Sequence, residues 1–229
     1  EGFSKAVRLV MQEAARGALS GVHGPVSKLI RVEDRYTTAI ETALGAAMQN
    51  IIVDDEASGK AAIGLLKRRD AGRATFLPLS TVTGRRLSEP SLANTPGYIG
   101  VASELVQTDG RYQGVLENLL GRTVIASTLD DAIAMARKSA NRVRIVTLDG
   151  QVMNPGGSMT GGSSAKSAGV LSRANELKRL EQERGRLLDT QSGYKKSLQE
   201  AQSQLAETEY EIKTIGAELR EAEDEVLRR

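Results

Sequence analysis

The sequence predicts a mixed α+β fold in which two similar β-α-β-α-β subdomains are followed by one long coiled-coil helix. Three observations lead to this prediction. An internal repeat lies in the first part of the chain, short apolar runs alternate with amphipathic stretches in both copies, and the last part carries an unbroken heptad pattern.

The repeat becomes visible when the chain is shifted by 76 residues along itself. Residues 24–45 then align with residues 100–121 without a gap, and eight of the 22 positions are identical. Average composition would give roughly one or two identities by chance. The identical pairs are Gly24/Gly100, Ser27/Ser103, Leu29/Leu105, Arg35/Arg111, Tyr36/Tyr112, Glu41/Glu117, Leu44/Leu120 and Gly45/Gly121. Both copies should therefore fold alike.

A helix over residues 4–19 is expected before the first copy. Each copy then begins with a β-rich run, at 27–32 and at 103–108. An amphipathic helix follows, with apolar residues four apart on one face: Tyr36, Ile40 and Leu44 in the first copy, and Tyr112, Leu116 and Leu120 in the second. Gly45 and Gly121 stand where a C′ glycine would end each helix.

The second half of each copy is a strand, a helix and a strand. The strands are expected at 51–53 and 124–126, and then at 74–77 and 143–148. The helices between them are expected to begin at Asp54-Asp55 and at Asp130-Asp131, since acidic residues favour the positive end of the helix dipole. They should end near Lys67 and Ala140. Asp149-Gly150 predicts a type I′ hairpin into 151–153.

These elements define the expected domains. Residues 1–165 form the globular domain, and residues 166–229 form the coiled-coil arm. Within the globular domain we place subdomain I at about 20–80, a linker rich in Ser, Thr, Gly and Pro at about 79–96, and subdomain II at about 97–165.

The arm has a register of spacings 3 and 4 over seven heptads whose positions are mostly apolar, which is typical of a coiled coil, although Arg184 and Gln191 make the seam uneven. Ser172 is a candidate N-cap, and a helix from there to Arg229 would be ~85 Å long. A single strand cannot bury its own seam, so we expect a partner helix, from a neighbouring molecule. The seam consists of Leu177, Leu180, Leu187, Leu198, Leu205, Ile212, Ile215, Leu219 and Val226.

Composition excludes several classes of site. The chain has no cysteine, no tryptophan and one histidine, His23. A disulfide framework, a thiolate or multi-histidine metal site and a base-stacking platform are therefore not expected, and neither is a cofactor. His23 is interpreted as a turn residue beside Gly24-Pro25. No segment is long and apolar enough for a membrane span, no signal-peptide pattern opens the chain, and the missing initiator Met suggests an excised fragment.

Positive charge is concentrated in two stretches, 60–86 and 137–144, although the net charge is only +2. Such stretches can form a patch for phosphates or an ordinary solvated surface, and the residues alone leave both interpretations open.

The glycine segment 154–163 has the spacing of a phosphate loop, but Gly162 stands where the essential lysine would be. Nucleotide binding is therefore improbable, and no constellation in the sequence requires an enzyme. Glycines at this density indicate a backbone that packs closely against another surface, such as that of a second chain.

Several segments resemble the hinge domain of structural maintenance of chromosomes (SMC) proteins, closest to those of bacterial chromosome-partition proteins. They are 24–30, 36–45, 72–79, 119–123, 146–150 and the glycine motif at 154–162. The resemblance implies an SMC-hinge-like fold of two subdomains and a head-to-head homodimer, with Gly156, Gly157, Gly161 and Gly162 at the dimer interface. It also implies secondary, non-specific DNA binding through basic residues near the junction of hinge and arm, for which the candidates are Lys67, Arg68, Arg69 and Arg73.

The resemblance further implies a role in chromosome condensation, segregation and sister chromatid cohesion, in a cytoplasmic, nucleoid-associated protein. The ATP-binding heads of such a protein, and the kleisin-type subunits expected at those heads, lie outside this chain, so the chain itself is not expected to be an enzyme. Two alternatives remain: a coiled-coil scaffold that does not contact DNA, and a nucleotide-binding enzyme that uses the glycine loop.

Overall fold

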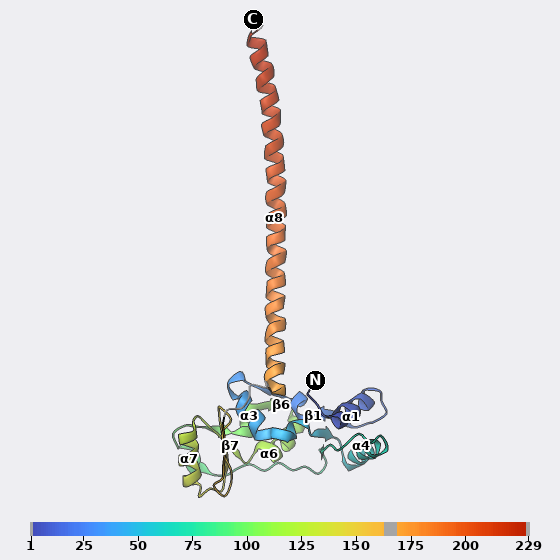
Figure 1. The fold of residues 1–229 in the computed structure, drawn as a ribbon, viewed down its shortest axis with the longest axis vertical. Helices are drawn as coiled ribbons and strands as arrows, with labels where there is room; N and C mark the ends of the chain where they lie inside the picture. Colours follow the sequence, from blue (N-terminus) through green and yellow to red (C-terminus); the bar gives the residue numbers. More distant parts are fainter. Residues whose placement is uncertain (1, 163–168, 228–229) are drawn as a thin grey trace. The chain divides into compact units, whose positions relative to one another are not determined.

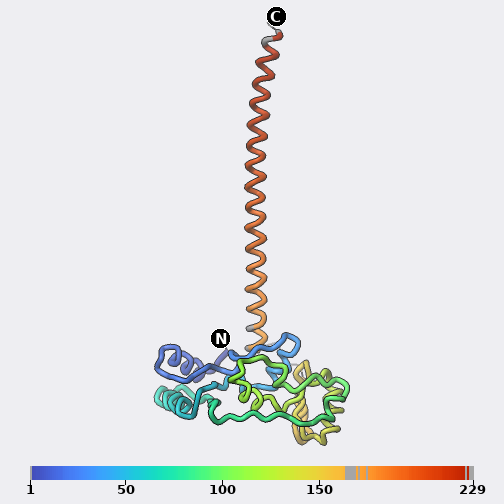
Figure 2. Tube along the Cα trace, turned by 180° about the vertical axis from the view of Figure 1, so that it is seen from behind, coloured from blue at the N-terminus to red at the C-terminus, as the bar shows by residue number. Residues whose placement is uncertain are grey.

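The computed structural model describes residues 2–162 and 169–227 and divides into two compact units, Glu1–Asn175 and Glu176–Arg229. The second unit is the larger part of one helix, α8 (Val170–Leu227). The predicted domain boundary at 165/166 lies outside the described residues. Within the first unit, α1 and α4 lie at one end and α7 at the other, with α3 and α6 between them (Figures 1 and 2).

Subdomain I is built on a three-stranded sheet in the order β1-β3-β4, with β3 antiparallel to β1 and parallel to β4. Helices α1 and α4 cover it and share one apolar cluster with β3. Its elements are α1 (Lys5–Ala15), β1 (Val22–Pro25), α2 (Val26–Leu29), β2 (Ile30–Val32), η1 (Asp34–Tyr36), α3 (Thr37–Leu44), η2 (Gly45–Gln49), β3 (Ile51–Val53), α4 (Glu56–Arg68) and β4 (Phe76–Pro78).

Subdomain II contains a five-stranded sheet in the order β10-β9-β8-β7-β5. Helix α7 packs on it through buried Ala132, Met135 and Ala136. Its elements, with the helix of the linker, are α5 (Pro90–Ala93), β5 (Tyr98–Val101), η3 (Ala102–Leu105), β6 (Val106–Thr108), η4 (Gly110–Tyr112), α6 (Gln113–Leu120), β7 (Thr123–Ala126), α7 (Leu129–Lys138), β8 (Arg144–Thr147), β9 (Val152–Met153) and β10 (Met159–Thr160).

The sequence repeat is also a structural repeat. Every element from β1 to α3 recurs 76 residues later, from β5 to α6, with the same bounds. Strands β2 and β6 pair antiparallel with Arg31 opposite Gln107, its own equivalent in the repeat. This register places a local two-fold axis between the two subdomains.

A single central core joins the subdomains. It contains α3 residues such as Ile40, α6 residues such as Leu116, and buried residues of β2 and β6. Because residues of both subdomains are interleaved in one apolar cluster, the two are expected to move as one body.

The predicted first strand of each copy needs correction. Residues 26–29 and 102–105 form helical turns, so that the strands occupy only 30–32 and 106–108. The preceding strands β1 and β5 were not predicted, because His-Gly-Pro and Tyr-Ile-Gly are too short and too rich in Gly and Pro to show a period-2 pattern.

The acidic helix starts are confirmed, with one difference between the copies. Asp55 is the N-cap of α4 and accepts the Ser58 backbone N–H at 2.8 Å, which lowers the pKa of its carboxyl. In the second copy Thr128 is the N-cap of α7, and Asp130 and Asp131 lie in the first turn. Helix α1 ends at Ala15, short of the predicted Leu19, and Gly17 follows with a φ of +77°.

The hairpin between β8 and β9 is present, but its turn is not type I′. Of the two predicted turn residues only Gly150 has a positive φ, of +89°. The Gly150 N–H donates to the Thr147 oxygen at 2.9 Å, and the Thr147 N–H donates to the Gln151 oxygen at 2.9 Å. The loop is therefore the three-residue type that ends in a glycine of positive φ.

Candidate functional site

The glycine segment forms a second hairpin, between β9 and β10. The Asn154 N–H donates to the Ser158 oxygen at 2.8 Å, and the Gly157 N–H donates to the Asn154 oxygen at 3.0 Å. Gly156 and Gly157 have φ values of +87° and +92°, which an L side chain rarely adopts. A hairpin is not the strand-loop-helix geometry of a phosphate loop, so the glycines serve the backbone turn.

Gly161 and Gly162 lie beyond β10 and are held by one side chain. The Gln151 Oε1 atom accepts the Gly162 N–H at 2.9 Å and leaves no room for a Cβ on Gly161. All four glycines of the predicted interface are exposed. The structure thus gathers them on and beside one outer strand.

Strand β10 is an edge of its sheet. Since Asn154 and Ser158 form a hydrogen-bonded pair, the next residue, Met159, directs its backbone N–H and C=O away from β9. Its side chain is 53% exposed. An exposed edge strand with unpaired backbone groups is a template for pairing with another strand.

The other sheet has a matching open edge at β4. In the repeat β4 corresponds to β8, which is covered by the β9–β10 hairpin, whereas no strand among the described residues covers β4. The parallel register to β3 turns the backbone groups of Phe76 toward this open edge. Pro78, which lacks an N–H, ends the strand, as is usual at sheet edges.

The four predicted DNA-contacting residues lie together at the end of α4. Lys67 and Arg68 are in its last turn, Arg69 is its C-cap and Arg73 follows in the next loop. All four are exposed, and no ion pair within the described ranges includes them. They form a free cationic surface, which we call the α4 cluster.

The second basic stretch is less available. The Lys138 Nζ donates to the Thr95 hydroxyl at 3.1 Å, Arg142 lies 3.6 Å from the Glu89 carboxylate, and the Arg144 Nη1 donates to the Ala43 oxygen at 2.8 Å. These contacts engage three cations of the second stretch, so the repeat does not make the two basic stretches equally available for phosphate contacts.

The structure adds a basic groove that sequence reasoning missed. A cavity of about 500 Å³ is lined by Lys28 and Arg31 of subdomain I and by Gln107, Asp109 and Arg111 of subdomain II. The two sets of residues are 76 or more apart and meet only through the β2–β6 pairing, so no local pattern announces them.

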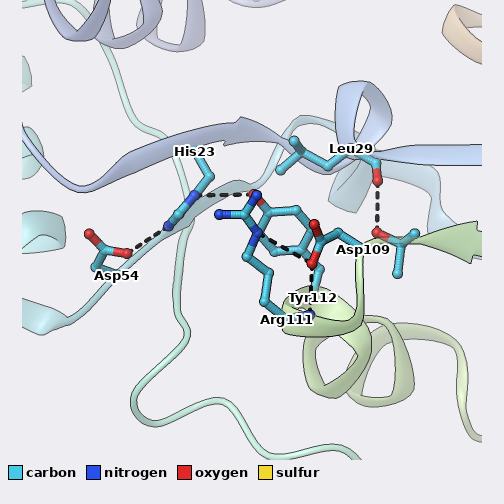
Figure 3. A network of polar contacts seen from close by, with 7 residues as sticks. His23, Leu29, Asp54, Asp109, Arg111 and Tyr112 are labelled. Atoms are coloured by element: carbon cyan, nitrogen blue, oxygen red, sulfur yellow. Dashed lines mark hydrogen bonds and ion pairs between the residues drawn. The ribbon is translucent and has the colours of Figure 1, made fainter.

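His23 supports the wall of this groove and is not a turn residue. It lies in β1, with its Nε2 atom 2.7 Å from the Asp54 carboxylate and its Nδ1 atom 3.1 Å from the Tyr112 hydroxyl (Figure 3). Arg111 stacks over the Tyr112 ring and pairs with Asp109 at 3.4 Å. The one histidine of the chain thus ties subdomain I to subdomain II.

The root of the arm is bound to subdomain I. Helix α8 begins at Val170, so Ser172 is not its N-cap. The acceptor for its first N–H groups is the carboxylate of Glu41 in α3, which accepts the Leu171 N–H at 2.7 Å and the Ser172 N–H at 3.1 Å.

The predicted seam of α8 is exposed in the single chain. Its nine residues have exposed fractions between 49% and 75%, and no described residue of this chain covers them. The partner helix therefore stays a prediction.

Within the described residues, no group of three or more His, Asp or Glu side chains could hold a metal ion. None of the helices described has a stretch long and apolar enough to cross a membrane.

Known proteins are similar to this chain in sequence and in fold. The family described as "SMC proteins Flexible Hinge Domain" matches residues 19–136, just over half of the 229 residues. The chromosome partition protein Smc of Bacillus subtilis (strain 168) is 41% identical over 218 residues, which cover 93% of this chain and 17% of that protein. The chain spans 14–17% of the length of the first curated relatives that it matches.

Two solved structures extend the comparison. An asymmetric dimer of the Geobacillus stearothermophilus SMC hinge domain matches with a TM-score of 0.74 and 44% identity, over 83% of this chain and 77% of that chain. The Pyrococcus furiosus SMC hinge domain matches with a TM-score of 0.60 and 29% identity, over 73% and 85%. Both are hinge domains and neither is an ATPase head. The extent and identity of these matches show that the chain belongs to the hinge domain family of SMC proteins.

Proposed function

We propose that this chain is the homodimerisation module of a chromosome condensation and segregation protein, and that it also binds DNA weakly and without sequence preference. In the longer protein, ATPase heads and kleisin-type subunits would act far from this module, in a cytoplasmic, nucleoid-associated assembly. The observation that carries the dimer is the exposed edge strand β10, which is flanked by glycines on both sides, together with the open edge at β4.

The proposed contact extends one sheet with the other. Strand β10 of one copy would pair with the open edge of β4 in its partner. In subdomain II, the equivalent edge of β8 is covered by the β9–β10 hairpin of the same chain. A two-fold axis makes this contact twice and closes the dimer. The exposed glycines Gly156, Gly157, Gly161 and Gly162 permit the close backbone approach.

The dimer is tested at Met159. Met159→Pro removes the outward N–H without breaking a bond to β9, while Met159→Ala keeps that N–H and removes only the side chain. Because α8 is itself expected to associate, these variants are compared in chains that carry Leu198→Ser and Leu205→Ser in the arm. In this background we expect the otherwise unchanged chain and Met159→Ala to sediment at twice the 24.5 kDa chain mass, and Met159→Pro to sediment as a folded monomer.

Bulkier residues at all four glycines should also yield monomers, and circular dichroism would show whether these variants are folded. A Met159→Pro variant that keeps the parent's dimer mass would rule out pairing through β10.

We place the proposed DNA site at the α4 cluster. The basic groove serves as the alternative site against which this assignment is tested. Phosphate contacts are made by Lys and Arg side chains that have no acidic partner. They weaken steeply with salt: the logarithm of the binding constant falls with the logarithm of the salt concentration, with a slope of about −0.9 per neutralised phosphate. Converting Lys67, Arg68, Arg69 and Arg73 to Gln should lower DNA affinity and flatten that slope, with the dimer unchanged.

The matched variant converts Lys28, Arg31 and Arg111 of the groove to Gln. Fluorescence anisotropy over a salt series would compare both variants with the parent. If only the groove variant loses affinity, the α4 assignment is wrong. If the parent itself does not bind DNA at low salt, the coiled-coil scaffold without DNA contact becomes the better description.

A further inference from the structure

We propose that Glu41 is the positioning residue of the arm, and that helix α3 couples the root of the arm to the glycine hairpin. This inference rests on the proposed dimer in one respect, namely that β10 lies at its interface. The anchoring of the arm itself does not depend on the dimer.

Glu41 supplies what the start of α8 lacks. The first N–H groups of a helix have no partner within the helix, and a carboxylate there also interacts favourably with the helix dipole. The Glu41 Oε1 atom accepts the N–H groups of Leu171 and Ser172 at 2.7 and 3.1 Å, and its Oε2 atom accepts the Ser172 hydroxyl at 3.2 Å. Gly169 lies so close to this carboxylate that a Cβ would overlap it.

Two further contacts fix the same turn. Leu171 is only 4% exposed and belongs to the central core. The Asn175 side-chain amide donates to the Asp34 carboxylate at 2.8 Å and to the Val32 oxygen at 3.2 Å. Residues 169–175 are therefore part of subdomain I, although they are the beginning of the arm.

Subdomain II also contacts α3, the short helix that carries Glu41. Arg144 of β8 donates from Nη1 to the Ala43 oxygen at 2.8 Å, at the end of α3. In the turn between β8 and β9, a Cβ on Gly150 would lie 3.0 Å from the Thr42 hydroxyl. That turn leads into β9, which pairs with β10. Eight residues of α3 thus connect the proposed dimer edge with the arm root.

This arrangement can transmit a displacement. A helix of eight residues is about 12 Å long and moves as a rigid element in a packed core, so a shift of the hairpin turn is passed to Glu41. If dimerisation and arm anchoring favour each other in this way, the coupling is reciprocal: the factor by which the dimer tightens the anchor equals the factor by which the anchor tightens the dimer.

The repeat provides a matched control. Glu117 occupies the equivalent position in α6, but its carboxylate binds the linker, where it accepts from the Arg86 Nε at 2.8 Å. It also accepts from the amide of Gln113 in its own helix at 3.1 Å. Glu117→Ala therefore removes the same group from the same helical position without touching the arm.

The first experiment measures hydrogen exchange of the full chain at the Leu171 and Ser172 amides. Glu41→Ala should increase exchange there strongly and Glu41→Gln partly, because Gln keeps one acceptor oxygen, whereas Glu117→Ala should leave both amides as in the parent. Unchanged protection in Glu41→Ala would overturn the anchor.

The second experiment measures the dimer dissociation constant by sedimentation, in full-length chains that carry Leu198→Ser and Leu205→Ser so that association through α8 does not contribute. Glu41→Ala should raise it about fivefold or more, which is the lower end of typical coupling factors, and Glu117→Ala should not. In the Arg144→Ala background, which breaks the tie between β8 and α3, Glu41→Ala should have little further effect.

The outcomes separate the two proposals. A dimeric parent whose dissociation constant is insensitive to Glu41→Ala would overturn the coupling and leave the dimer standing. A parent that is monomeric throughout would overturn both the dimer and the coupling, while the exchange data would still decide the anchor.

Discussion

Gly45 and Gly121 occupy equivalent positions directly after α3 and α6, but they need glycine for different reasons. Gly45 has a φ of +52° and open space around its Cα. Gly121 has an ordinary φ of −67°, but a Cβ there would overlap the backbone oxygens of Arg85 and Glu117. The first glycine serves the conformation of a helix end, and the second makes room for the linker.

Alanine at the two positions should therefore act differently. Gly45→Ala should cost about 1–3 kcal/mol of unfolding free energy, because its φ of +52° and ψ of −126° lie in a region that L residues rarely adopt. Gly121→Ala should cost about 1–3 kcal/mol through overpacking, and it should also release the linker, because the Leu87 N–H donates to the Gly121 oxygen at 2.7 Å. Urea unfolding gives the energies and hydrogen exchange at Leu87 gives the distinction. Equal exchange at Leu87 in both variants would contradict this account.

At the scale of elements, periodic segments could be predicted and short ones could not. Helices α3, α4, α6 and α7 carry apolar faces and capping residues, which are local signals, so the sequence predicts them closely. Strands β1 and β5 are four residues long and contain Gly or Pro, so tertiary pairing alone defines them. The turn at Asp149-Gly150 shows the same limit, since its type depends on the register of β8 and β9.

The candidate sites divide in the same way. The glycine hairpin and the α4 cluster are continuous in sequence and could be found there. The basic groove and the Glu41 anchor could not, because they join residues such as Arg31 and Arg111, or Glu41 and Ser172, that only the fold brings together. The repeat offers one partial signal, since Glu41 and Glu117 are identical in the two copies and both bind a segment outside their own helix.

At the scale of the whole molecule, α8 exposes an apolar seam that a single helix cannot bury. Over its 58 residues the described side chains form only two ion pairs with each other, Arg179–Glu176 and Lys196–Glu200. Such pairs stabilise an isolated helix by only a few tenths of a kcal/mol each. The stability of this helix should therefore depend on a partner that covers its seam.

This dependence can be measured as helicity against concentration. In the parent chain, helical circular dichroism at 222 nm and its thermal midpoint should rise with protein concentration as α8 finds a second strand. In the heptad register that has Leu177 at an a position, Leu198 and Leu205 are also a positions. Replacing these two seam residues by Ser should therefore remove that dependence. Leu188 and Tyr210 are 56% and 73% exposed but lie outside the a and d positions, so replacing them by Ser should preserve the concentration dependence. If the two double variants behave alike, the exposed leucines do not form a seam and the arm is a solvated single helix.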